Sequence, residues 1–151
     1  MGNLKLTSTA FSHGGELPRN IGYKNGNTSP PLTISGIPTG AKSLTIIMDD
    51  PDAMGAVGKV WVHWVMWNID STITEIAEWE RPSGAVEGTT DFGEVGYGGP
   101  APPDKKHTYV LKLYALDCVL DLSSKSTKVD VDKAMEGHIL DQAILEGTYA
   151  P

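Results

Sequence analysis

The stretch VWVHWVMWNI, residues 60–69, is apolar on both of its faces and holds three of the four tryptophans of the chain. A short run of this kind, rich in β-branched and aromatic residues, is typical of a strand that is buried on both sides. Two more runs have the same character, LTIIM at residues 44–48 and YVLKLYALDCV at residues 109–119. The sequence therefore predicts a sheet with three buried strands at its centre.

Weaker patterns predict the elements around these strands. Residues 4–7 alternate in polarity and predict an edge strand, and residues 72–79 predict shorter extended pieces. Residues 84–103, which are rich in glycine and proline, predict a long irregular passage. The 17 glycines and 10 prolines of the chain separate short apolar runs, which is typical of a β-rich domain with long loops.

One helix is expected near the C-terminus, over about residues 131–143. Val131, Met135 and Ile139 recur at the spacing of one helix face, and either Asp130 or Asp132 can cap its start. Residues 145–149 are expected to return as a final strand. The predicted fold class is all-β, an antiparallel β-sandwich of two sheets with Greek-key-like connections, one C-terminal helix and few other short helices.

Composition restricts the class of protein. A chain of 151 residues suits a single domain over 1–151, and its net charge of −7 repels nucleic-acid backbones and anionic lipid surfaces. We therefore expect no nucleic-acid partner. Cys118 is the single cysteine, so no internal disulfide can form, and its apolar surroundings predict a buried structural thiol. The chain shows no signal peptide and no apolar run of about 18 residues, which favours a cytoplasmic protein without stable membrane insertion.

Polar side chains are expected at the ends of the central strands. Asp50 should share a buried face with Leu44, Ile46 and Met48, at the point where Pro51 ends the ladder. Asp52 is then expected in a loop. The same alternation places Trp61, His63, Val65 and Trp67 on one face, and places His107 and Tyr109 on a face with Leu111 and Leu113. Strand ends beside loops are where a β scaffold usually builds a site.

Each of these residues also has an ordinary structural explanation. A histidine in an apolar strand is often a satisfied core residue, an acid before proline often forms a turn, and the tryptophans suit a core. A catalytic interpretation finds little support, because the chain has no HExxH metal motif and no G-x-S-x-G nucleophile motif. We therefore expect a protein that is not an enzyme, with no catalytic residue, no metal and no cofactor.

Several long motifs together resemble the phosphatidylethanolamine-binding protein family, also called Raf kinase inhibitor-like proteins, and specifically its short bacterial and archaeal branch. The resemblance covers nearly the whole chain and is carried by NTSPPL at 27–32, DPDA at 50–53, VHWVMWNI at 62–69, FGEVGYGGPAPPDKKHTYVLKLYALD at 92–117 and GHILDQAILEGTYA at 137–150. It implies a pocket at the surface whose ligand-binding residues are Asp50, Asp52, Trp61, His63, Gly98, Gly99, Pro100, His107 and Tyr109.

The chemistry of these residues suits a small anionic or zwitterionic ligand, such as a phosphoethanolamine-like headgroup. Exposed N–H groups of the glycine turn can approach an anion without a Cβ in the way, and the histidines and the Tyr109 hydroxyl add donors. Asp50 and Asp52 can orient the imidazoles or meet an ammonium group. If the histidines bind the anion as cations, phosphate affinity should fall as pH rises through their range.

Other partners stay open at this point. The family resemblance also permits an inhibitor of proteases or kinases that acts through protein–protein contacts. An apolar strand edge or Trp79 could support a homodimer. Two positions depart from the family pattern: Met54 stands where proline usually follows DPDA, and Thr108 stands where arginine often separates the histidine from the tyrosine. The second departure removes a cation from the neighbourhood of the pocket.

Overall fold

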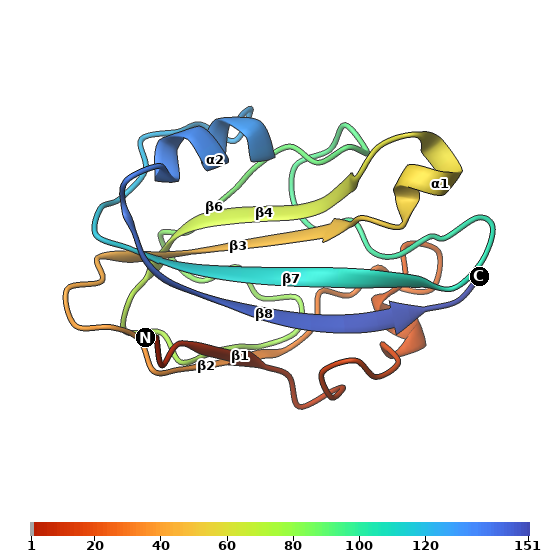
Figure 1. The fold of residues 1–151 in the computed structure, drawn as a ribbon, viewed down its shortest axis with the longest axis horizontal. Coiled ribbons are helices and arrows are strands. Elements are labelled where there is room, and N and C mark those ends of the chain that lie inside the picture. The colour runs from red at the N-terminus through yellow and green to blue at the C-terminus, as the bar shows by residue number, and fades with distance from the viewer. Residues whose placement is uncertain (1) are drawn as a thin grey trace.

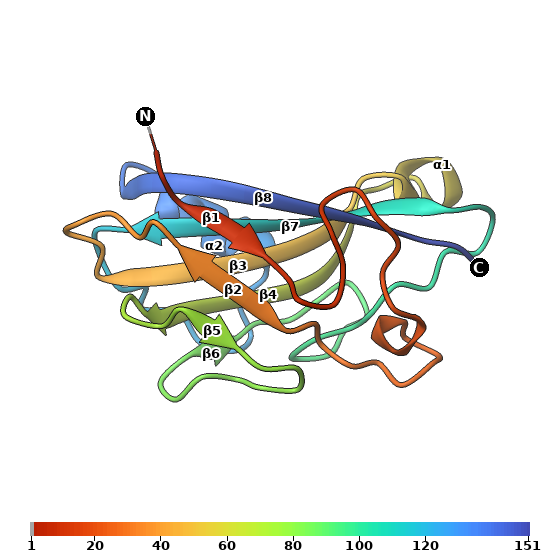
Figure 2. The same ribbon diagram turned by 90° about the horizontal axis from the view of Figure 1, so that it is seen from below.

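The computed structural model describes residues 2–151, which form two antiparallel sheets and few helices (Figures 1 and 2). The larger sheet has five strands in the order β6-β4-β3-β7-β8, and the smaller has three in the order β1-β2-β5. The strands are β1 (Lys5–Thr7), β2 (Leu32–Ser35), β3 (Ser43–Asp50), β4 (Trp61–Asp70), β5 (Glu75–Ile76), β6 (Val86–Glu87), β7 (His107–Leu116) and β8 (Ile139–Tyr149).

The three runs that were predicted as buried strands are confirmed as the centre of the larger sheet. β3 lies between β4 and β7 and pairs antiparallel with both. All eight residues of β3 are buried, because strands cover its two edges and other elements cover its two faces. The predicted edge strand at residues 4–7 is confirmed as β1, and β5 forms within residues 72–79, where shorter extended pieces were predicted. β6 was not predicted, because residues 84–103 were expected to be irregular.

The two sheets share one apolar core. Leu6 and Ile34 of the smaller sheet pack in one cluster with Ile46, Trp64 and Leu111 of the larger sheet. Figure 2 shows β1, β2 and β5 lying across the face of the larger sheet. An all-β protein with two antiparallel sheets is therefore confirmed, and the Greek-key-like sandwich stays a prediction.

The opposite face of the larger sheet is covered by helix α2 (Lys128–Met135) (Figure 1). Val131 and Met135 of α2 pack against Ile47, Val65 and Trp67 of the sheet. This second apolar layer explains why the central strands are apolar on both faces.

The helix starts earlier and ends sooner than the sequence analysis predicted. Thr127 caps its start, and Asp130 completes a capping box by accepting hydrogen bonds from the Thr127 backbone N–H and hydroxyl. The helix ends at Met135, and Gly137 then adopts a left-handed conformation with φ of +80°. The expected helix over residues 136–143 is wrong: residues 139–149 form β8, which pairs with β7 along its length.

A β-bulge changes which face each residue of β4 occupies. Met48 of β3 pairs with Trp64, but the next residue, Asp49, pairs with Val62, so that His63 is an extra residue on β4. Trp64 therefore faces the shared core on the same side as His63, whereas Val65 and Trp67 face α2. The prediction that Trp61, His63, Val65 and Trp67 share one face is wrong, because simple alternation cannot anticipate a bulge.

The structure decides two more predictions at strand ends. Asp52 lies in the turn after β3, as predicted, and is the N-cap residue of a short helix, α1 (Ala53–Val57). Strand β7 ends at Leu116, three residues before the predicted end, so Cys118 lies in the bend after the strand and is half-buried. A third short helix, of 3-10 type, spans Arg19–Ile21.

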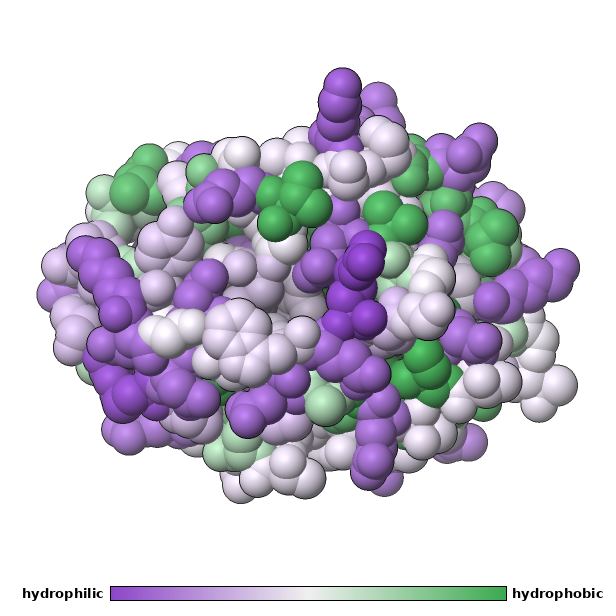
Figure 3. All heavy atoms as spheres, turned by 180° about the vertical axis from the view of Figure 1, so that it is seen from behind, coloured by the Kyte–Doolittle hydropathy of each residue, from purple (hydrophilic) through white to green (hydrophobic). Residues whose placement is uncertain are grey.

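The surface opposite to the view of Figure 1 carries separate hydrophobic patches among hydrophilic side chains (Figure 3). Within residues 2–151, no helix is both long enough and apolar enough to cross a membrane.

Candidate functional site

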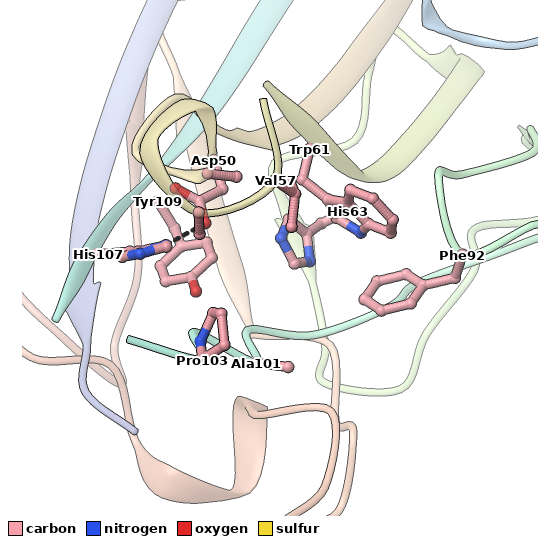
Figure 4. A pocket seen from close by; sticks show the side chains of 11 residues that line it. Asp50, Val57, Trp61, His63, Phe92, Ala101, Pro103, His107 and Tyr109 are labelled. Atoms are coloured by element: carbon pink, nitrogen blue, oxygen red, sulfur yellow. Dashed lines mark hydrogen bonds and ion pairs between the residues drawn. The ribbon is translucent and has the colours of Figure 1, made fainter. Parts of the chain in front are cut away.

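A cavity of about 150 Å³ opens at the end of the larger sheet where β3 ends and β4 and β7 begin. Helix α1 closes one side, and segments around Phe92 and Pro103 close the other (Figure 4). Its lining is Asp50, Ala53, Ala56, Val57, Trp61, His63, Phe92, Ala101, Pro103, His107 and Tyr109. The walls are thus mainly aromatic and aliphatic, with four polar side chains among them.

His107 lies between two carboxylates. Its Nδ1 is 2.6 Å from Asp50 Oδ2, and its Nε2 is 2.7 Å from Asp104 Oδ1. A carboxylate only accepts, so both ring nitrogens must donate and the ring is an imidazolium. Burial alone would lower the pKa of His107, but the hydrogen bonds to Asp50 and Asp104, together with their charges, raise it above the usual value.

His63 has the opposite environment. Its Nδ1 lies 2.7 Å from the carbonyl oxygen of Gly98 and must therefore donate to it. Burial lowers the pKa of His63, and the Gly98 carbonyl and the Asp50 charge oppose that effect only in part. At neutral pH the ring is uncharged, and Nε2 is the ring atom left to accept a proton or a hydrogen bond from a ligand.

Tyr109 places a phenol in the cavity wall, between the two histidines. The rings of His63 and Tyr109 meet edge to face with their centroids 5.2 Å apart. The Tyr109 hydroxyl is buried and makes no hydrogen bond to residues 2–151. Burial and the nearby Asp50 charge raise the pKa of Tyr109, which keeps the hydroxyl protonated and able to donate. A buried hydroxyl without a partner is uncommon and calls for a functional explanation.

Asp50 and Asp52 have different positions although they are close in sequence. Asp50 Oδ1 accepts a hydrogen bond of 2.9 Å from the Asp52 backbone N–H, while Oδ2 holds His107. Asp52 points away from the cavity, and its Oδ2 accepts a 2.8 Å hydrogen bond from the Thr108 backbone N–H. Asp52 therefore ties α1 to the start of β7 and does not line the cavity.

The glycine turn is a buried support and not an exposed anion cradle. The Gly98 N–H donates to the His63 carbonyl at 2.8 Å, and the Gly99 N–H donates to Asn27 Oδ1 at 2.7 Å. A Cβ on Gly98 would collide with the Phe92 ring, and a Cβ on Gly99 would collide with the Ile21 carbonyl. The expectation that this turn offers exposed N–H groups is wrong, because both groups already have partners in the protein.

The structure thus brings five of the nine predicted residues into the cavity wall: Asp50, Trp61, His63, His107 and Tyr109. The other four, Asp52, Gly98, Gly99 and Pro100, lie behind it as supports, and Pro100 accepts a 2.9 Å hydrogen bond from the Tyr23 backbone N–H. Sequence reasoning missed Asp104, Phe92 and Val57. The position of Asp104, three residues before His107, was the signal that could have pointed to the ion pair.

Charge around the cavity is more negative than the sequence analysis assumed. None of the residues that line it is a lysine or an arginine. Asp50 and Asp104 lie on either side of one imidazolium, and both N–H groups of that imidazolium are bound to their carboxylates. The expectation that His107 offers a donor to an anion is therefore wrong. Of the fully buried polar groups in the wall, the Tyr109 hydroxyl is the one without a hydrogen bond to residues 2–151.

Comparison with known proteins gives a consistent result. The family model described as Phosphatidylethanolamine-binding protein matches residues 7–150. A UPF0098 protein of Methanothermobacter thermautotrophicus is 45% identical over 151 residues, which cover 97% of this chain and 98% of that protein.

Two solved structures have nearly the same fold over their whole length. One is the crystal structure of a phosphatidylethanolamine-binding protein homologue from Chlamydia trachomatis, with a TM-score of 0.92 and 40% identity, covering 99% of this chain and 98% of that one. The other is Escherichia coli YbcL, described as a new member of the mammalian PEBP family, with a TM-score of 0.90, 33% identity and 98% of each chain covered.

Proposed function

The chain belongs to the phosphatidylethanolamine-binding protein family, and on that premise we propose that it is a non-enzymatic binding protein whose cavity takes a small phosphate-bearing zwitterion of the phosphoethanolamine type. One observation carries the proposal. The Tyr109 hydroxyl is buried in the cavity wall, close to Asp50 and the Ala101 backbone, and forms no hydrogen bond within the described chain. A ligand oxygen would satisfy it.

The phosphate end of such a ligand would lie between Tyr109 and His63. The hydroxyl donates one hydrogen bond, and His63 Nε2 takes up a proton on binding and then donates a second, charge-assisted one. In the free protein burial keeps His63 neutral, so this proton arrives with the ligand. The expected consequence is an affinity that falls as pH rises.

The ammonium end would lie on the Asp50 side of the cavity. The carboxylates around His107 outnumber its single positive charge, which disfavours a bare anion and favours a ligand that also carries a cation. A zwitterion therefore matches the charges of the cavity better than inorganic phosphate does.

The size of the cavity supports a headgroup and argues against a larger molecule. Pockets for drug-sized ligands span roughly 300–1,000 Å³, and this one encloses about 150 Å³. An acyl chain or a nucleoside attached to the headgroup would have to lie outside, on the surface.

Binding without catalysis fits the arrangement of the polar groups. Both nitrogens of His107 are held by carboxylates, so this ring has no free position from which to accept a proton as a general base. The lining residues include no serine, threonine, cysteine or lysine that could serve as a nucleophile. An inhibitor of proteases or kinases that acts through its surface is the other candidate, and pocket mutations would leave that activity intact.

Titration calorimetry with phosphorylethanolamine, ethanolamine and inorganic phosphate tests the proposal. Phosphorylethanolamine should bind more tightly than either fragment. Tyr109→Phe should weaken its binding by about five- to tenfold, the equivalent of one net hydrogen bond of about 1 kcal/mol. Tyr114→Phe is the matched control, because Tyr114 lies on the same strand but packs on the α2 side. Equal affinities for the wild type and Tyr109→Phe would overturn the assignment.

A further inference from the structure

A second cluster of side chains lies at the other end of the larger sheet. The cluster consists of Asp117, Cys118 and His138. A carboxylate oxygen, a thiol sulfur and an imidazole nitrogen, one from each residue, lie within 4.8 Å of one another. Two of the three residues are hydrogen-bonded to each other: His138 Nδ1 donates to Asp117 Oδ1 at 2.8 Å. β7 runs from the cavity to this cluster, a span of about 30 Å for a ten-residue strand.

The backbone holds these three residues in place. Asp117 continues the pairing of β7 with β8, because its N–H donates to the His138 carbonyl at 3.0 Å. The carbonyl of Cys118 accepts a hydrogen bond of 2.5 Å from the Ser43 hydroxyl, which fixes the bend after β7. On the other side, the left-handed Gly137 and the hydrogen bond from the His138 N–H to the Met135 carbonyl, 2.9 Å, define the turn that presents His138.

The cluster is reachable from solvent. The side chains of His138 and Asp117 are 47% and 44% exposed, and Cys118 is half-buried beneath them. Figure 1 shows the turn between α2 and β8 at the end of the sheet opposite to α1, so a ligand here would not touch the cavity. The cluster is therefore independent of the proposed headgroup site.

We propose that Asp117, Cys118 and His138 form a binding site for Zn²⁺, with the fourth position of the metal open to water. Thiolate, imidazole and carboxylate are the three ligand types that Zn²⁺ takes in proteins, and a set of three protein ligands leaves one open coordination position. In a tetrahedral zinc site the ligand atoms stand about 3.3–3.8 Å apart, from bond lengths of about 2.0–2.3 Å. The present cluster spans up to 4.8 Å, and His138 Nδ1 and Asp117 Oδ1 are 2.8 Å apart. Rotation of the exposed side chains would have to bring the thiol nearer and move these two atoms slightly apart.

Binding balances in charge and protons. In the free protein burial and the Asp117 charge raise the pKa of the Cys118 thiol, so the sulfur carries a proton. Zn²⁺ displaces the thiol proton to solvent. It also takes the place of the His138 Nδ1 proton, which leaves to solvent, and the neutral ring then carries its single proton on Nε2, supplied by solvent where the free ring had none there. An ion pair between His138 and Asp117 would not involve the Cys118 thiol. Participation of the thiol therefore distinguishes a metal site from a simple ion pair.

Calorimetric titration with Zn²⁺ and absorption spectroscopy with Co²⁺ test the site. The wild type should bind one Zn²⁺ per chain, and Cys118→Ser and His138→Gln should each weaken binding by at least about tenfold, because each removes one of three ligands. The Co²⁺ form should show a thiolate-to-cobalt charge-transfer band that Cys118→Ser abolishes.

His13→Gln is the matched control. His13 is also an exposed histidine beside an acid, 3.9 Å from Glu146, but the metal-ligand cluster among residues 2–151 does not include it. This variant should bind Zn²⁺ as the wild type does. The proposal is overturned if the wild type shows no saturable binding, if Cys118→Ser binds within tenfold of it, or if His13→Gln loses binding to the same extent.

Discussion

His63 and His107 line the same cavity, yet their immediate partners set them to opposite charge states. His107 donates to two carboxylates and is a cation, whereas His63 donates to a carbonyl and is neutral. Both rings are almost fully buried, so burial does not distinguish them. At the scale of single residues the charge state of each imidazole therefore depends on the acceptor that it faces, and sequence reasoning that counted two equivalent histidine donors could not see this.

Replacing the two histidines in turn by glutamine should change the pH dependence of stability in opposite directions. The pKa of His107 is higher in the folded state than in the unfolded state. His107 therefore adds its full contribution to the free energy of unfolding at pH values below the unfolded-state pKa, and this contribution is lost as pH rises through the folded-state pKa. The folded-state pKa of His63 is lowered, so its contribution is present above the unfolded value and is lost as pH falls through the folded one.

Urea unfolding between pH 5 and 9 measures these differences. His107→Gln leaves the buried Asp50 without its cation and should cost about 3–5 kcal/mol at pH 6, with a smaller deficit at pH 9. His63→Gln should show a deficit that is larger at pH 8 than at pH 5. If both deficits vary with pH in the same direction, the assigned charge states are wrong.

At the scale of elements, irregularities position the site. The three central strands were predictable, because a run of residues that is apolar on both faces is typical of a strand buried on both sides of a sheet. The bulge at His63 was not predictable, since it depends on pairing with β3 and moves Trp61 and His63 onto the side of the cavity. The end of α2 was missed for a related reason: Ile139 fits a helix face, but pairing with β7 places it in β8.

The Gly98-Gly99 turn gives a prediction at this scale. Gly99→Ala should destabilise the protein by about 1–3 kcal/mol or more, because the new Cβ meets the Ile21 carbonyl, a backbone atom that cannot rotate away. Gly55→Ala is the control, because a Cβ on Gly55 in helix α1 meets nothing within 4 Å. That variant should be neutral or slightly stabilising. Thermal unfolding of both variants checks the pair, and equal melting temperatures would refute the packing role of Gly99.

At the scale of the whole molecule, the two proposed sites lie at opposite ends of the larger sheet. The family, the two antiparallel sheets and five of the nine candidate residues could be predicted from long motifs and strand alternation. Phe92 could not, because it comes from the irregular passage at residues 88–106, where no periodicity places a side chain. Asp104 lies in the same passage, and its position three residues before His107 was the available signal. The partial exposure of Cys118 could not be predicted either, because it depends on β7 ending at Leu116.

The central claim is that the cavity beside Tyr109 binds a phosphate-bearing zwitterion with uptake of a proton at His63. An amide NMR titration with phosphorylethanolamine, repeated from pH 5.5 to 8, tests it most directly. The account predicts shifts that cluster at Asp50, His63, Gly98 and His107, and an affinity that falls as pH rises across this range, by up to about tenfold per pH unit for one proton. Shifts elsewhere, no shifts, or an affinity that does not change with pH would contradict it.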